Sequence, residues 1–204
     1  MRSTRILVLL LCVLVLGCSR GPTPVRAPNV KPAEAAASAL DAYDSDGNGQ
    51  LDKDELEACP GLLDGFAGFD KNKDEAIDSE EIAGRLTNLY GNGVGMLSLG
   101  CRVTSRGRPV PDCIVRLIPE SFLGEAVKPA EGTTRESGTA MLCIAADDLP
   151  AGLENVRGVH SGIYRAEISH ESPSITKLIE KSGPFGFDVS VGDQVSGLTI
   201  ELSR

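Results

Sequence analysis

The feature that most constrains this chain is a twelve-residue segment, 44–55, that places oxygen-bearing side chains at alternate positions. Positions 1, 3 and 5 are Asp44, Asp46 and Asn48, and Gly49 stands at position 6, where a left-handed turn is needed. A calcium ion takes about six to eight hard oxygen ligands, and this spacing supplies them from one loop. The ligands predicted for this first loop are the side chains of Asp44, Asp46, Asn48, Asp52 and Glu55 and the backbone carbonyl of Gln50.

A second segment of the same length, 70–81, repeats the pattern with one departure. Position 6 is Glu75 where the pattern requires glycine, and a residue with a Cβ costs roughly 1–2 kcal/mol in the left-handed region. We therefore expect the second loop to bind calcium more weakly than the first; a loop that only supports the first is the alternative. The ligands predicted for it are Asp70, Asn72, Asp74, Ala76 (through its carbonyl), Asp78 and Glu81.

The charge of the chain is acidic and unevenly distributed. The formal net charge is −9, and fifteen Asp or Glu stand against three Lys between Glu34 and Glu81. Such crowding is either a solvated acidic surface or a set of groups that a cation neutralises, and the ligand spacing favours the cation. The negative charge also argues against nucleic-acid binding, which depends on Lys and Arg.

Residues 33–91 resemble a compact EF-hand pair of the kind found in exported bacterial proteins. In such a pair each loop lies between two helices, and Leu51, at position 8, would point inward where paired loops form a short β-bridge. A dockerin-like module that binds a partner protein is the alternative, but Glu55 and Glu81 at position 12 differ from the aspartate usual in dockerins. The helices expected around the loops span residues 33–43, 53–58, 61–69 and 79–90.

The N-terminus is typical of a targeting signal. Two arginines precede an apolar stretch, 6–16, which is too short to span a bilayer as a helix. The residues around Cys18 resemble the lipobox of bacterial lipoproteins, in which the cysteine becomes the first mature residue and receives acyl chains; an ordinary signal peptide with an incidental cysteine is the alternative. We expect a signal peptide at residues 1–17, a flexible tether at residues 18–31, and an exported protein anchored to a membrane on its periplasmic or cell-surface side.

From residue 97 onward, short alternating segments are separated by Gly and Pro turns, which is typical of an all-β sandwich or barrel. Segment 101–120, with its Gly-x-Pro-Val-Pro turn, and segment 162–168, with Gly-x-Tyr, resemble carboxypeptidase regulatory-like domains, which are frequent in lipoproteins of the planctomycete type. The resemblance implies a non-catalytic, transthyretin-like sandwich; a generic immunoglobulin-like sandwich is the alternative. The strands expected are 101–103, 113–117, 140–144, 164–168, 185–189 and 198–202.

The cysteines beyond the leader allow two interpretations. An exported chain permits disulfides, and strand alternation places Cys101 and Cys113 on inward faces. The family resemblance implies that their strands belong to opposite sheets, so a disulfide between Cys101 and Cys113 is one expectation, and two buried free thiols are the other. No Cys-x-x-Cys spacing occurs, which argues against a zinc site.

Together these patterns predict an α+β fold in two domains: a small all-α EF-hand pair at residues 32–91 and an all-β, seven-stranded, transthyretin-like sandwich at residues 97–204. No catalytic motif surrounds His160 or His170, the only histidines, so we do not expect an enzyme. The expected function is that of a calcium-binding, membrane-anchored envelope lipoprotein with a structural or adhesive sandwich; calcium-dependent, dockerin-like partner binding is the alternative. The expected partners are the membrane, through the lipid anchor, and an envelope protein or polysaccharide.

Overall fold

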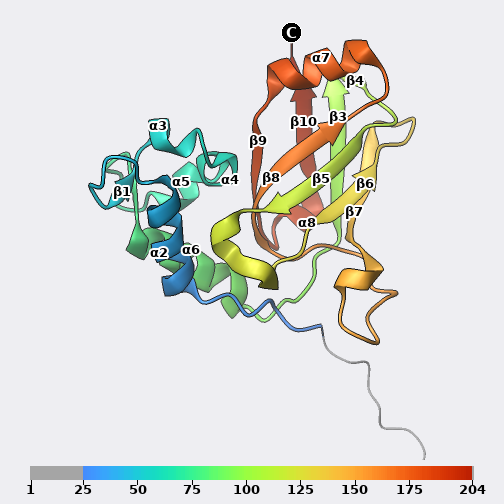
Figure 1. Cartoon of the computed structure of the whole chain (residues 1–204). Coiled ribbons are helices and arrows are strands. Elements are labelled where there is room, and N and C mark those ends of the chain that lie inside the picture. Colours follow the sequence, from blue (N-terminus) through green and yellow to red (C-terminus); the bar gives the residue numbers. More distant parts are fainter. Residues whose placement is uncertain (1–24, 204) are drawn as a thin grey trace, which may run out of the picture.

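The computed structural model describes residues 25–203, in which a helical part is followed by a curled sheet (Figure 1). The predicted signal peptide, Cys18 and the first residues of the predicted tether lie outside the described residues. Within the described end of the tether, Val25 and Val30 are partly buried against the hydrophobic core. Among residues 25–203, no helix is both long enough and apolar enough to cross a membrane.

The helical part, residues 32–91, places short helices around two loops; the helix predicted over 61–69 is divided in two at Gly65, and the one predicted over 53–58 ends at Leu56. Its first helix begins with Pro32, whose fixed φ suits the first helical turn, and it buries an alanine face. One helix follows each loop, α3 after the first and α6 after the second, and both begin with a capping box. The elements are α2 (Pro32–Tyr43), β1 (Gln50–Leu51), α3 (Lys53–Leu56), α4 (Pro60–Asp64), α5 (Phe66–Phe69), β2 (Ile77–Asp78) and α6 (Ser79–Gly91).

The sheet part, residues 97–203, forms one curled sheet in the strand order β10-β3-β7-β6-β5-β8-β9, with β4 paired beside β3. All neighbours are antiparallel except β10 and β3, which run parallel. Five of the six strand segments predicted from alternation lie within a strand of this sheet, and the sixth, 113–117, begins one residue before its strand, so all six strands are confirmed; strands 108–109 and 130–133 were not predicted. The strands are β3 (Leu99–Ser105), β4 (Arg108–Pro109), β5 (Ile114–Pro119), β6 (Ala130–Thr133), β7 (Thr139–Ile144), β8 (Gly162–Ser169), β9 (Phe185–Val189) and β10 (Leu198–Leu202).

The sheet part also contains helices that the sequence analysis did not predict. The longest, α7, starts at a proline and packs Ile175, Leu178 and Ile179 against the core; their i, i+3, i+4 spacing is that of an amphipathic helix. The fold is therefore a mixture of helix and strand here too, and not all-β. The other helices are η2 (Ser121–Ala126), η3 (Ala146–Asp148), α7 (Pro173–Ser182) and α8 (Asp193–Ser196).

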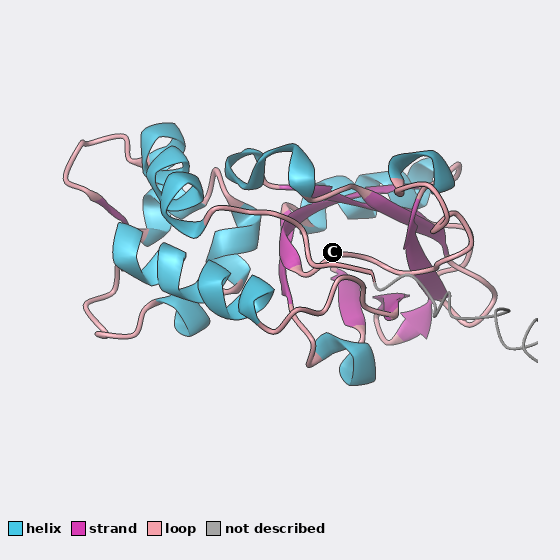
Figure 2. Cartoon of the chain, turned by 90° about the horizontal axis from the view of Figure 1, so that it is seen from below, coloured by secondary structure: helices cyan, strands magenta, loops and turns pink. Residues whose placement is uncertain are grey.

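The helical part lies against one side of the sheet (Figure 2), and there α4 contacts β8 and β9. The approach is close because glycines meet there: a Cβ at Gly186 of β9 would lie 1.9 Å from the carbonyl carbon of Pro60, and one at Gly61 would lie 2.8 Å from the carbonyl oxygen of Tyr164. Buried side chains of both parts belong to one continuous hydrophobic cluster. The sequence boundary near residue 91 thus does not separate two cores in space.

The disulfide between Cys101 and Cys113 is not formed in this structure. Both residues are free and buried, with 2% and 0% exposed surface, which matches the predicted inward faces. In the strand order of the curled sheet, β7 and β6 lie between β3 and β5, so whether the two thiols can pair stays a prediction. Burial, and to a smaller extent the neighbouring Cys113 thiol, raise the pKa of the Cys101 thiol to about 12, as expected for a thiol in the core.

Candidate metal centre

The first loop brings three carboxylates together. One oxygen from each of Asp44, Asp46 and Glu55 lies within 4.8 Å of the others, and among residues 25–203 this is the one acidic cluster with such spacing. The three residues stand at positions 1, 3 and 12 of the predicted loop, so the fold closes the loop on itself. Three like charges at this separation repel one another unless a cation or protons neutralise them.

Backbone amides hold the position-1 carboxylate in place. Oδ1 of Asp44 accepts hydrogen bonds from the N–H groups of Gly47 at 2.7 Å and Asn48 at 3.2 Å, and Oδ2 accepts one from the N–H of Gly49 at 2.9 Å. These bonds, the one from Gly49 foremost, lower the pKa of Asp44. The hydrogen bonds therefore orient the carboxylate and favour its charged form, which is the form that binds metals.

The end of the first loop is fixed by a reciprocal cap. Asp52 caps α3 by accepting from the N–H groups of Asp54 and Glu55 at 2.9 and 3.0 Å, and Glu55 Oε2 accepts from the N–H of Asp52 at 3.1 Å. Glu55 Oε1 accepts from the N–H of Ser45 at 2.7 Å. Slight burial acts to raise the pKa of Glu55, but these hydrogen bonds outweigh it and lower that pKa.

The second loop repeats most of these hydrogen bonds at equivalent positions. Asp70 accepts from the N–H groups of Lys73 at 2.6 Å and Glu75 at 3.2 Å. Glu81 accepts from the N–H groups of Lys71 at 2.8 Å and Asp78 at 3.2 Å, and Asp78 caps α6 through the N–H of Glu81 at 2.9 Å. Two segments with different sequences thus adopt one loop geometry.

The two loops are joined side by side. Gln50 and Leu51 pair with Asp78 and Ile77 in a two-stranded antiparallel bridge, which confirms the predicted inward position of Leu51. Leu51 and Ile77 are both fully buried. The side-chain amide of Gln50 also donates to Asp74 Oδ2 at 3.1 Å, so the seventh residue of one loop contacts a predicted ligand of the other.

Both loops use left-handed residues at the same two positions. At position 6, φ is +85° for Gly49 and +69° for Glu75, as expected from the sequence. At position 4, φ is +75° for Gly47 and +63° for Lys73. Lys73 is therefore a second strained residue of this loop, and the ligand pattern did not predict it. The sequence signal is that the equivalent residue of the first loop, Gly47, is a glycine. The second loop therefore carries two residues with a Cβ where the first carries two glycines.

The predicted ligands of both loops fit a hard cation. The donor set consists of carboxylate, amide and carbonyl oxygens, with no sulfur or imidazole, which suits calcium and not zinc or copper. Asn48 Oδ1 accepts a hydrogen bond from the N–H of Gln50 at 2.7 Å, and Asn72 Oδ1 accepts one from the N–H of Asp74 at 2.9 Å. The loop backbone is thus organised around these oxygens.

Two polar contacts that the sequence did not reveal connect the loop helices to the sheet part. The hydroxyl of Tyr43, directly before Asp44, donates to Glu120 Oε2 at 3.1 Å. Arg85 of α6 contacts Asp188 of β9, with Nε and Nη2 at 2.8 and 2.7 Å from Oδ2. Burial raises the pKa of both Glu120 and Asp188. The partners lie 77 and 103 residues apart in sequence, which is why local patterns give no sign of them.

Comparison with protein-family models, with curated proteins and with solved structures finds no match to this chain.

Proposed function

We propose that this chain is a calcium-binding protein in which residues 32–91 form an EF-hand pair that carries a strong site at residues 44–55 and a weaker one at residues 70–81. The observation that carries the proposal is the repetition of one hydrogen-bond pattern in two loops whose first residues stand 26 apart in the sequence. A chance acidic turn has no reason to occur twice with the same caps, the same left-handed positions and a bridge between them.

The calcium is a structural ion in this proposal. The outer helices of the pair are held to the sheet by the Tyr43–Glu120 and Arg85–Asp188 contacts, and the inner helices, α3, α4 and α5, have only four or five residues each. A large opening of the kind used by calcium sensors would break these contacts. Dockerin-like partner binding is the alternative, and it predicts that calcium addition exposes a binding surface.

The proposal extends to the ends of the chain. Cys18 would carry acyl chains that anchor an exported protein to a membrane, and calcium outside the cytosol is abundant enough for weak sites to fill. Residues 97–204 would be a non-catalytic, carboxypeptidase regulatory-like module with a structural or adhesive role. The curled, mainly antiparallel sheet supports this assignment only at the level of β-rich architecture.

Calorimetric titration of chelator-stripped protein tests the calcium proposal. Two binding events are expected, and Glu55→Gln should abolish the stronger one because position 12 supplies two oxygens. Glu57→Gln, an exposed position outside the predicted ligand set, removes the same charge and should leave both events unchanged. No heat at millimolar calcium, or equal effects of the two substitutions, would show that the loops are an acidic surface only.

A second measurement separates the structural ion from the switch. Calcium should raise the melting temperature of the protein without increasing the fluorescence of a dye that binds apolar surface. An increase in dye fluorescence on calcium addition would instead support calcium-dependent partner binding.

A further inference from the structure

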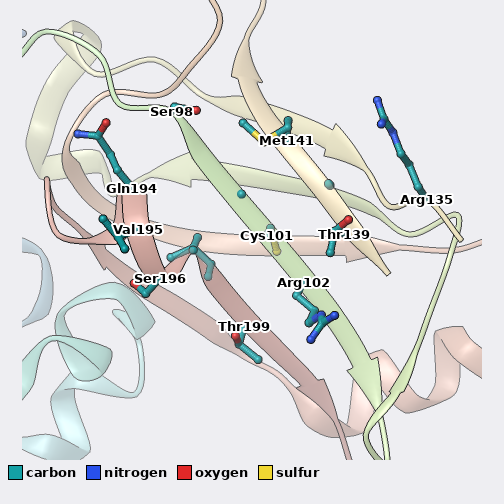
Figure 3. A pocket seen from close by; sticks show the side chains of 14 residues that line it. Ser98, Cys101, Arg102, Arg135, Thr139, Met141, Gln194, Val195, Ser196 and Thr199 are labelled. Atoms are coloured by element: carbon teal, nitrogen blue, oxygen red, sulfur yellow. The ribbon is translucent and has the colours of Figure 1, made fainter. Parts of the chain in front are cut away.

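A groove of about 480 Å³ lies on the outer face of the sheet, where β10, β3 and β7 adjoin and α8 forms one wall (Figure 3). The strand register aligns Thr199, Arg102 and Thr139 across the three strands. Gly100 and Gly197 also line the groove, and without side chains they leave the backbone of its floor accessible. The groove is therefore a surface feature formed by regular structure and not a gap between loops.

Exposed apolar side chains gather at this groove. Of the four large hydrophobic residues that are exposed among residues 25–203, two line it: Met141, which is 54% exposed, and Val195, which is 95% exposed. In Figure 3 Val195 lies toward the left-hand end and Met141 near the middle. Because both residues line the same groove, it offers apolar contact area to a ligand.

The charge of the groove is opposite to that of the protein. The chain has 29 acidic and 20 basic residues, yet the fourteen residues that line the groove include Arg102 and Arg135 and no Asp or Glu. Within residues 25–203, neither guanidinium makes a hydrogen bond or an ion pair, in contrast to that of Arg85, which pairs with Asp188. In Figure 3 Arg135 lies at the right-hand end and Arg102 lies below the middle. They are therefore available to bind carboxylates.

We propose that this groove binds an extended acidic peptide segment of a partner protein, with carboxylates at Arg102 and Arg135 and an aliphatic side chain between Met141 and Val195. A guanidinium matches a carboxylate in shape and charge, and the hydroxyl and amide groups of Thr139, Ser196 and Gln194 can bind the peptide backbone. An anionic polysaccharide fits less well, because no aromatic ring lines the groove to support a sugar ring. This inference does not depend on calcium binding.

Panning of phage-displayed random heptapeptides on the wild-type protein, with counter-selection on the double variant Arg102→Glu/Arg135→Glu, tests the proposal. The enriched peptides should share two or more acidic residues and an aliphatic residue. A synthetic copy of the most enriched peptide should bind in fluorescence anisotropy, and the double substitution should weaken its binding by about tenfold or more, because it removes two charged contacts. Val195→Ser should weaken binding severalfold, and Arg157→Glu, an exposed arginine outside the groove, should have no effect.

The contrary outcomes are equally specific. Failure to enrich any peptide against the counter-selected variant, enrichment of neutral or basic peptides, or equal losses in Arg102→Glu and Arg157→Glu would overturn the proposal. Stronger binding of polygalacturonate than of any peptide, with the same dependence on Arg102, would identify the groove as a polysaccharide site instead. Peptide binding that disappears in chelator while the circular dichroism of the sheet persists would assign recognition to the calcium loops and not to this groove.

Discussion

The clearest consequence of the loop geometry concerns Glu75, which stands at position 6 of the second loop with φ at +69°. Its side chain is exposed, and its N–H donates to Asp70 at 3.2 Å. The left-handed conformation is thus what directs this N–H at the position-1 carboxylate. Replacing Glu75 with Gly keeps the N–H and removes the Cβ that makes the conformation costly.

The expected size of the effect follows from two opposing terms. Left-handed backbone costs a residue with a Cβ roughly 1–2 kcal/mol, and a glycine loses about 0.5–1 kcal/mol more backbone entropy on ordering. The difference favours glycine by about 0.5–1 kcal/mol. Because repulsion among the carboxylates should loosen the ion-free loop, we expect this gain to appear mainly as affinity, that is, as a roughly two- to fivefold lower Kd at the second site.

The assay is a calcium titration in which backbone amide resonances of each loop report the occupancy of that loop. Glu75→Gln provides the matched control, since it removes the same charge but keeps the Cβ; the Kd for Glu75→Gly should be lower than for Glu75→Gln. The reverse test uses Gly49→Ala in the first loop, where a Cβ would meet nothing within 4 Å, so that only the backbone is perturbed. Equal affinities for the Gly and Gln variants, together with no loss in Gly49→Ala, would refute the argument from backbone strain.

Three further predictions concern groups outside the loops. Arg85→Met keeps the apolar stem but leaves the carboxylate of Asp188, which is 8% exposed, buried without its partner. This substitution should lower the free energy of unfolding in urea by about 3 kcal/mol. Adding Asp188→Asn should recover part of that loss, and no recovery would contradict the ion-pair explanation. Burial lowers the pKa of His160 from 6.5 to about 4, so the unfolded chain takes up a proton there first as the pH falls. The contribution of neutral His160 to the free energy of unfolding is therefore fully present above pH 6.5, and up to about 3 kcal/mol of it is lost as the pH falls to about 4. His160→Gln should remove that part of the pH dependence in denaturant titrations. For the predicted anchor, Cys18→Ala should abolish metabolic labelling with palmitate and release the protein from membranes; unchanged labelling would exclude Cys18 as the acylated residue.

The features that could be predicted from the sequence are those that neighbouring residues determine. The twelve-residue ligand spacing places the helices, the left-handed turn at Gly49 and the inward position of Leu51, all of which the structure contains. Alternation of apolar and polar residues likewise locates the strands. Whether the loops hold calcium is a question of binding, which neither the spacing nor the fold measures, and so it stays a prediction.

The features that could not be predicted depend on residues far apart in the chain. The order of strands decides that Cys101 and Cys113 lie on strands separated by two others, and alternation within a strand carries no information about that order. The amphipathic helix α7 lies between two strands in a region rich in Gly and Pro turns. The turns are typical of an all-β segment, so the helical spacing of its apolar residues did not lead to a helix prediction. The Arg85–Asp188 pair joins segments 103 residues apart.

The close packing of α4 against β9 bears on what calcium would do for the rest of the molecule. Gly186 and Gly61 allow backbones to approach to distances that any side chain would prevent, and Leu62 and Phe69, both fully buried, belong to the same hydrophobic cluster as the sheet residue Tyr164. Neutralising the crowded carboxylates of the loops stabilises the helices that begin and end at those loops. Since α4 lies between the two loops in sequence and contacts β8 and β9, unfolding the helical part would expose these strands to water. The free energy of calcium binding should therefore stabilise the sheet as well as the loops, although no predicted ligand lies in the sheet.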